Sequence, residues 1–349
     1  MDIIRPNNEL IKSYNSGNIE KFKELIKDGH DVNCLDMFGK SLISLVVMNF
    51  DDVPRNKEFF DELLKAGVKL HPIGNEMGLL SCSIISKNDT YYLEKLISHK
   101  MNINSCGTSD GNNKYGPPII DAIIFKKYNH IDVLLKNDLD ISSCDEEGIP
   151  VLNFLISRYV ISNDFDRFDH YFKLFVEKGF DADAGDTLGI KPLHYLSAHI
   201  SDKNIFDILF NSDHPINVNS RDDKGNTPLI WAAIHNNVSS IEILIEKGVN
   251  LNLRNSEGYT ALESAAIREQ LESFDFLMQN GVNLLLIDKQ GNNILHKIAK
   301  NNINTYCYEK ISQKHPELLT MKNNKGETPN EIYNIFVKNQ NNKELAYEI

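Results

Sequence analysis

The sequence predicts an all-α solenoid of about nine to ten helix-turn-helix units, joined by β-turn or hairpin connections. Three observations predict this fold. A glycine follows a polar turn at regular intervals, the residues after it carry the start signals of a helix, and another glycine ends a second helix before the next turn.

The regular spacing of the turn glycines is the first observation. Successive members of the series lie 39, 38, 32, 41, 36, 33, 33 and 35 residues apart. A period of this length that contains one turn and two helices is typical of stacked repeats, because one such unit is too small to bury its apolar face alone. The series consists of Gly39, Gly78, Gly116, Gly148, Gly189, Gly225, Gly258, Gly291 and Gly326.

The first helix of each unit is clearest after Gly225. Glycine accepts the positive φ of a tight turn, and the hydroxyl of Thr227 can cap the helix that follows. Pro228 then takes the first helical position, where a missing N–H costs nothing. The pair Ala232 and Ala233 lets neighbouring helices approach closely. The same order of residues recurs at 255–266.

The second helix of the unit is predicted over 238–247. Ile241, Leu244 and Ile245 have the spacing of a buried helix face, and Gly248 ends the helix as a C-cap residue. A short segment that contains Asn250 then leads into the next turn. Related closing segments recur at 27–33, 65–68, 177–183 and 279–283.

These two patterns resemble those of the ankyrin repeat family, Asp-x-x-Gly-x-Thr-Pro-Leu-His-x-Ala-Ala and Leu-Leu-x-x-Gly-Ala-Asp-x-Asn. Further fragments at 189–194, 291–296 and 326–329 agree. The resemblance covers nearly the whole chain, and we interpret residues 1–349 as one solenoid. Its repeats are degenerate over 1–185 and near the family pattern over 186–329, with a C-terminal cap and tail over 330–349.

Three segments depart from the repeat. Residues 51–57 are expected to lengthen a link between two helices, because Pro54 opposes a continuous helix there. Residues 105–115 read as a flexible finger that lengthens one turn, and residues 157–167 as a longer interhelical loop. Insertions in repeat proteins map to loops and often to the binding face, and drift at tolerant loops is the alternative.

The composition bounds the partners and the compartment. The formal net charge of -12 opposes nucleic-acid and anionic-membrane binding and favours a basic protein partner, although solubility alone also explains it. An odd number of well-separated cysteines, five in all, favours a reducing compartment. Without a secretory signal or a membrane-length apolar run, the chain is expected to be soluble, cytoplasmic or delivered into a host cytosol, and monomeric when free.

The sequence predicts neither an enzyme nor a cofactor or metal site. It lacks a phosphate-binding loop, and His194 and His199 lie five residues apart without a third ligand nearby. The family resemblance implies that His194 and His296 hydrogen-bond their local turns. Trp231 is expected in the core, and the cysteines are expected to be small, semi-buried residues without a nucleophile's partners; those beside turns are Cys34, Cys106 and Cys144.

The resemblance also implies where a partner binds, namely on the concave face formed by the turn tips and the inner helices. Large apolar residues at the turn tips are candidate contacts, because exposed side chains of this kind often form interface hot spots. These are Phe38, Met77, Tyr115, Leu188, Ile190 and Tyr259. The ends of the inner helices add His199, His235, Arg268 and Asn301. Charged turn residues beside them are Asp223, Lys224, Arg254 and Glu257.

The expected function is therefore non-catalytic binding of a specific protein, with a pathogen or viral effector that acts on host proteins as one version. The alternative is an inhibitor or immunity protein that blocks the active site of a basic enzyme. A remote alternative is an enzyme with an unrecognised site in the N-terminal half, which would require a deep pocket with perturbed ionisable groups between about 70 and 167. A modest further option is a substrate for hydroxylation at Asn33, Asn219 or Asn252.

Overall fold

A computed structural model describes residues 8–49, 53–70, 78–86, 89–104, 116–140, 144–145, 147–162, 167–301 and 305–335. Over these ranges the regular elements are helices, as predicted, and extended pairing is limited to two isolated bridges, Leu35 with Ser41 and Cys144 with Pro150. The chain divides into two compact units, Met1–Arg158 and Tyr159–Ile349. We describe each unit by itself.

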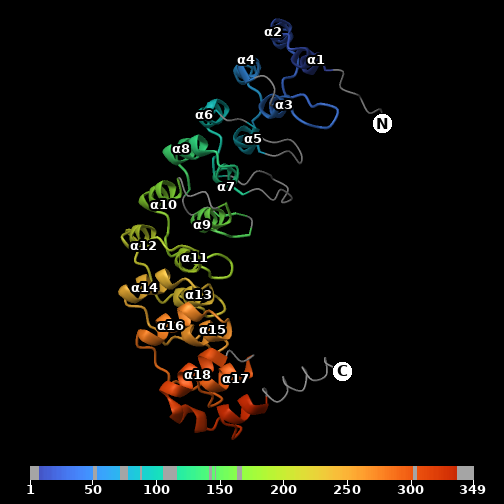
Figure 1. The fold of residues 1–349 in the computed structure, drawn as a ribbon. Helices are drawn as coiled ribbons and strands as arrows, with labels where there is room; N and C mark the ends of the chain where they lie inside the picture. The colour runs from blue at the N-terminus through green and yellow to red at the C-terminus, as the bar shows by residue number, and fades with distance from the viewer. Residues whose placement is uncertain are drawn as a thin grey trace, which may run out of the picture. The chain divides into compact units, whose positions relative to one another are not determined.

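The first unit consists of helices that pack in consecutive pairs, α1 with α2, α3 with α4, α5 with α6 and α7 with α8. Odd-numbered helices also pack on odd-numbered ones and even on even, so the unit has two layers (Figure 1). The bounds are α1 Glu9–Ser16, α2 Ile19–Lys27, α3 Leu42–Met48, α4 Val53–Lys65, α5 Leu79–Ser86, α6 Tyr91–Ser98, α7 Pro118–Ile124 and α8 Tyr128–Lys136. Helix α9, Val151–Ser162, spans the division between the units.

The second unit repeats this arrangement. Helices α11, α13, α15 and α17 form an inner layer, and α10, α12, α14 and α16 form an outer layer, each helix packing on the next of its layer (Figure 1). The bounds are α10 Phe168–Glu177, α11 Pro192–His199, α12 Lys203–Phe210, α13 Pro228–Ile234, α14 Val238–Glu246, α15 Ala261–Ile267, α16 Leu271–Gln279, α17 Ile294–Lys300 and α18 Thr305–Lys314. A 3-10 helix, Pro316–Thr320, follows, and residues 329–335 are helical.

The helices begin and end where the sequence signals are. The Thr227 hydroxyl accepts a hydrogen bond from the Ile230 amide at 3.3 Å, and Pro228 opens α13. Thr260 caps α15 in a capping box with Glu263. At the other end of a unit, Gly248 follows α14 with a φ of +78°, the left-handed conformation that ends a helix.

In the turns that the structure describes from their first residue, an aspartate or asparagine three places before the glycine organises the turn. Its side-chain oxygen accepts hydrogen bonds from backbone amides two or four residues further on, as Asn255 Oδ1 does from Glu257 and Tyr259. The equivalent residues in the other turns are Asp36, Asp145, Asp186, Asp222, Asp288 and Asn323.

The turn tips of the second unit are joined by backbone hydrogen bonds. The Asp223 amide donates to the Leu188 carbonyl, Ser256 to Lys224 and Asn324 to Gln290, each at 2.9 Å. These three bonds hold the tips that they join in register with one another along the inner layer.

Aromatic side chains fill the space between the layers. In the first unit Phe59 meets Tyr14 and Phe22 edge to face, with ring centroids 5.2 and 4.9 Å apart. In the second unit Phe206 and Phe274 are fully buried. Burial of each such side chain contributes roughly 1.5–3 kcal/mol, which supports stacking as the source of stability.

Two of the predicted insertions are partly helical, which corrects the sequence interpretation. Helix α4 begins at Val53, so Pro54 lies in its first turn, where proline removes no intrahelical hydrogen bond. Helix α9 continues to Ser162 because its apolar run extends past residue 157. The predicted finger at 105–115 lies outside the described residues.

Candidate functional site

An open groove of about 580 Å³ lies on the second unit, between turn tips and the C-terminal ends of inner helices α13, α15 and α17. The turns contribute Lys224, Asn226, Asn255, Glu257 and Tyr259. The helices contribute Ile234, Ser264, Ile267, Arg268, Lys300 and Asn301.

The repeat places these residues in register. Ile234, Ile267 and Lys300 are the last residues of α13, α15 and α17 and follow one another by 33 residues. The residues after them are the C-caps of the same helices, and Arg268 and Asn301 are two of these. The groove is therefore built from the same repeat positions in successive units.

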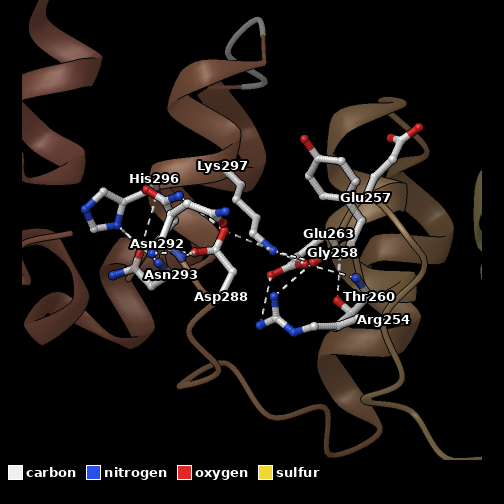
Figure 2. Close-up of polar contacts among 12 residues, drawn as sticks. Arg254, Glu257, Gly258, Thr260, Glu263, Asp288, Asn292, Asn293, His296 and Lys297 are labelled. Atoms are coloured by element: carbon white, nitrogen blue, oxygen red, sulfur yellow. Dashed lines mark hydrogen bonds and ion pairs between the residues drawn. The ribbon is translucent and has the colours of Figure 1, made fainter. Parts of the chain in front are cut away.

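A buried ion pair lies next to the groove residue Tyr259, and we call it the floor of the groove. Lys297 Nζ lies 2.8 Å from Glu263 Oε2, and the two side chains are 6% and 3% exposed (Figure 2). Lys297 also donates to the Gly258 carbonyl at 2.6 Å, which Arg254 Nη1 approaches at 2.9 Å. Burial lowers the pKa of Lys297, and the Glu263 carboxylate opposes this effect.

The same network continues into the next turn. Asp288 Oδ2 lies 3.9 Å from Lys297 Nζ and accepts a hydrogen bond from the Asn292 side chain (Figure 2). Burial by itself would raise the pKa of Asp288, but the hydrogen bonds from Asn292 and the Lys297 charge lower it overall. The floor thus ties α15, α17 and the two turns before them into one assembly.

Tyr259 is fixed above this floor. Its ring centroid lies 5.2 Å from Lys297 Nζ, and its hydroxyl accepts a hydrogen bond from Asn301 Nδ2 at 3.0 Å. Its backbone amide donates to Asn255 Oδ1 at 2.9 Å. A groove residue held in this way needs little ordering when a partner binds.

The lining of the groove is more positive than the chain as a whole. Lys224, Arg268 and Lys300 line it with one acid, Glu257, in a chain of net charge -12. Lys300 is 3.8 Å from Glu327, whereas neither Lys224 nor Arg268 is in an ion pair with any residue that the structure describes.

A row of aromatic and imidazole rings runs along the preceding inner helices. The rings of His199 and His235 are 5.0 Å apart, and Trp231 stacks on His235 at 5.7 Å. Burial and the His235 charge lower the pKa of His199. Trp231 is not a core residue as predicted: it is half-buried, because its Nε1 reaches Asp222 Oδ2 at 3.0 Å.

The structure brings some predicted contact residues together and separates others. Lys224, Glu257, Tyr259 and Arg268 line one groove, whereas Arg254 turns inward to support its floor. Phe38 lies in the first unit and is 79% exposed. The other predicted residues of the second unit are Leu188 and Asp223, which are exposed, and Ile190, which is half-buried. The predicted contacts Met77 and Tyr115 lie outside the described residues.

Sequence reasoning missed several groove residues. The repeat register could have found them. Lys300 occupies the same repeat position as Ile234 and Ile267. This position comes directly before a predicted contact, as Ile267 does before Arg268 and Lys300 before Asn301. The missed residues are Asn226, Ile234, Asn255, Ser264, Ile267 and Lys300.

The buried histidines bond local backbone, as the family resemblance implied. His194 Nδ1 accepts from the Lys191 amide at 3.1 Å, and its Nε2 lies 3.2 Å from the Asn226 carbonyl of the next turn. His296 makes the equivalent contacts with Asn293 and Glu327. Burial lowers the pKa of both histidines.

The titratable side chains elsewhere do not form a metal cluster: among the described residues, no three His, Cys, Asp or Glu side chains are placed to hold an ion. Burial raises the pKa of Cys34 to about 11 and that of Cys307 to about 12, so both thiols stay protonated at neutral pH. Cys106 lies outside the described residues. None of the described helices combines the length and the apolar character that a membrane span requires.

The asparagines proposed for hydroxylation have structural roles. Asn33 Oδ1 accepts the Lys69 amide at 2.7 Å, Asn219 Oδ1 the Asn250 amide at 2.8 Å and Asn252 Oδ1 the Asn283 amide at 2.9 Å. Each therefore links one repeat to the next.

The stacked helix pairs, the capped turns and the inter-repeat histidine bonds together define an ankyrin repeat protein. The family described as "Ankyrin repeats (3 copies)" matches residues 159–255 and 193–288, so this part of the chain consists of ankyrin repeats. Proteins of this family generally mediate protein–protein interactions and are typically non-catalytic.

This chain is similar to two curated viral proteins. Both carry the name "Ankyrin repeat protein OPG189" and come from Variola virus, one of them from a human isolate from India. Each is 27% identical over 217 residues, which cover 60% of this chain and 36% of the relative. The chain thus spans about a third of the length of the curated relatives that it matches.

Proposed function

We propose that this chain is a non-catalytic interaction protein that captures a specific protein partner in the groove of its second unit. The observation that carries the proposal is the groove itself: residues from three successive repeats line it, and a buried ion pair fixes the wall that contains Tyr259. Tyrosine and arginine dominate protein interfaces energetically, and both are present here as Tyr259 and Arg268.

The likeness to a viral ankyrin repeat protein supports an effector that acts on host proteins. The inhibitor of a basic enzyme, the alternative that net charge favours, has less support from the groove, whose lining contains three cations and one acid. The net charge sums over the whole surface, whereas a contact responds mainly to charges within a Debye length of about 8 Å.

An enzyme in the N-terminal half has less support still. Burial raises the pKa of Asp121 to about 6 and lowers that of His130, but both side chains are almost completely buried, at 0% and 1% exposed. A perturbed group marks a candidate active site when it lies in a cleft, and these two lie in the packed core.

Affinity capture with two matched variants tests the proposal. Tyr259→Ala with Arg268→Ala removes two groove side chains, and Ser239→Ala with Glu242→Ala changes the exposed side of outer helix α14. We expect the groove variant to bind the partner about 30-fold more weakly, at about 1 kcal/mol for each of the two side chains, while the outer variant retains it.

Circular dichroism of both variants checks that the helices are intact. Equal recovery of the same partner by the folded groove variant and the unchanged chain would reject the groove as the binding site. Capture from a host-cell lysate, compared with a lysate of the source organism, separates an effector from an inhibitor of an endogenous enzyme.

A further inference from the structure

We propose that the groove takes an acidic, extended segment of the partner, with carboxylates seated against Lys224, Arg268 and Lys300. The inference rests on the proposed function and adds the chemistry of the segment to it. Its starting point is the contrast between a groove lined by three cations and one acid and a chain with a net charge of -12.

The free cations decide which segment can bind. Lys224 and Arg268 make no ion pair with any described residue, so a partner that covers them must supply counter-charges or leave two desolvated cations behind. A neutral or basic segment would leave both cations unpaired and would bind more weakly for that reason. An acidic segment pairs with both, and the planar Arg268 guanidinium matches a carboxylate in bidentate geometry.

The remaining polar groups of the groove favour the same ligand. Asn301 donates to the Tyr259 hydroxyl, and among the described residues no acceptor takes the proton of that hydroxyl. The Asn226 and Asn255 amides bond to one another at 2.9 Å. The groove therefore offers donors more than acceptors, and carboxylate oxygens are acceptors only.

The spacing of the cations sets the form of the segment. Lys224, Arg268 and Lys300 come from three successive repeats, and stacked helices lie roughly 8–10 Å apart. An extended chain advances about 3.3 Å per residue, so carboxylates about three residues apart would meet successive repeats. The predicted segment is thus about six or seven residues of extended peptide with an acid at every third position.

A polyanion such as nucleic acid is a poorer fit. Its continuous charge would pass Glu257 within the groove and meet the repulsion of the whole chain. Separate carboxylates on a peptide can meet the three cations and leave Glu257 beside an uncharged residue.

Selection from a displayed library of random peptides about 12 residues long, enough to cross three repeats, tests the inference on the full chain. We expect enrichment of Asp and Glu at spaced positions. Enrichment of neutral or basic peptides that groove substitutions abolish would overturn the acidic segment and leave the proposed function standing. Selection of no peptide that depends on groove residues would count against the groove as a binding site, and so against both.

Charge reversal provides the matched comparison. Arg268→Glu with Lys300→Glu should weaken the best acidic peptide about tenfold or more, and Lys178→Glu with Lys314→Glu, which changes the net charge equally at exposed positions outside the groove, should not. Replacement of the peptide's acids by their amides should have the effect of the groove variant. Competition by single-stranded DNA that is stronger than competition by the peptide would assign the groove to a polyanion instead.

Discussion

At the scale of the residue, the first position of each turn matters as much as the glycine. Asp186, Asp222, Asn255 and Asp288 all fold the turn around a side-chain oxygen, and their partners are backbone amides. Aspartate and asparagine are equivalent in this role because both present an acceptor at the same distance from the backbone.

The turn glycines differ in what surrounds them, and this predicts different costs for the same substitution. Gly225 and Gly258 have φ of +70° and +85°, so alanine at either should cost about 1–2 kcal/mol from backbone conformation. A Cβ at Gly225 would also lie 2.9 Å from the Ser256 amide, whereas at Gly258 nothing lies within 4 Å. Urea unfolding should therefore show Gly225→Ala to be the more destabilising; equal midpoints for the two variants would contradict the close contact between the tips at Gly225 and Ser256.

Asp121 is a buried acid whose charge is only partly compensated. Neither of its carboxyl oxygens has a hydrogen bond of good geometry to a described residue, and the nearby Ser81 hydroxyl offsets only part of the effect of burial, which raises the pKa to about 6. The folded state thus favours the protonated acid. The contribution of the protonated Asp121 side chain to the free energy of unfolding is fully present below about pH 4 and is lost as the pH rises through 6.

Asp121→Asn should consequently stabilise the chain at pH 7.5, by about 3 kcal/mol at most, and have little effect at pH 4. Thermal unfolding followed by far-UV circular dichroism at both pH values measures this difference. The exposed Asp138→Asn is the control and should shift neither midpoint. A lower midpoint for Asp121→Asn at pH 7.5 would show that the carboxylate is paired after all.

At the scale of the element, the Glu263–Lys297 pair joins α15 to α17. Glu263 occupies the repeat position of His194 and His296. The two histidines contact a carbonyl of the next turn through their imidazoles, whereas Glu263 accepts a hydrogen bond from Lys297. A buried pair of this kind adds little stability compared with apolar residues, but the loss of one partner leaves a buried charge.

A double-mutant cycle tests the interaction between Glu263 and Lys297. Lys297→Met and Glu263→Gln should each cost about 3–5 kcal/mol, and the double variant should cost clearly less than the sum. Urea unfolding followed by the fluorescence of Trp231, the only tryptophan of the chain, reports on this unit. The exposed pair Lys203 and Glu246 is the comparison, and we expect it to show little coupling because solvent screens both charges. If the two changes in the free energy of unfolding were additive, the interaction between Glu263 and Lys297 would not contribute to the stability of the fold.

The helices and turns also show which structural features could be predicted from the sequence. Gly225, Thr227 and Pro228 specify a turn and a helix start through local chemistry, so the helix pairs of the second unit could be predicted closely. The orientations of Arg254 and Trp231 could not be predicted, because they depend on contacts in the folded chain. Arg254 contacts Gly258 and Glu263. Trp231 contacts Asp222 and His235. Pro54 misled because its position within a helical turn cannot be read from its presence alone.

At the scale of the whole molecule, acid should destabilise the second unit through two buried histidines. His194 and His296 have lowered pKa values in the second unit, and their Nδ1 atoms must stay unprotonated to accept backbone hydrogen bonds. Their stabilising contribution is complete above the ordinary histidine pKa and is lost as the pH falls below about 6.5. In the first unit two effects of acid oppose one another, because burial raises the pKa of Asp121 to about 6 and lowers the pKa of His130.

Trp231 fluorescence should therefore give a lower unfolding midpoint at pH 5 than at pH 7. Substitution of His194 and His296 by Gln should flatten this dependence, and His170→Gln on outer helix α10 should not. Identical midpoints at the two pH values in the unchanged chain would contradict the assignment of neutral, bonded imidazoles.

The backbone hydrogen bonds between turn tips have a consequence for how such a chain can change in evolution. Asp223 and Ser256 each donate an amide to the tip before them, and Leu188 and Lys224 offer the matching carbonyls, so consecutive tips present the same connectors. In-frame loss of residues 222–254 would place Asn255 directly after Arg221 with these connectors preserved. Recombination between copies of the repeat can thus lengthen or shorten the array by complete units, and changes by part of a unit would leave a break in the register.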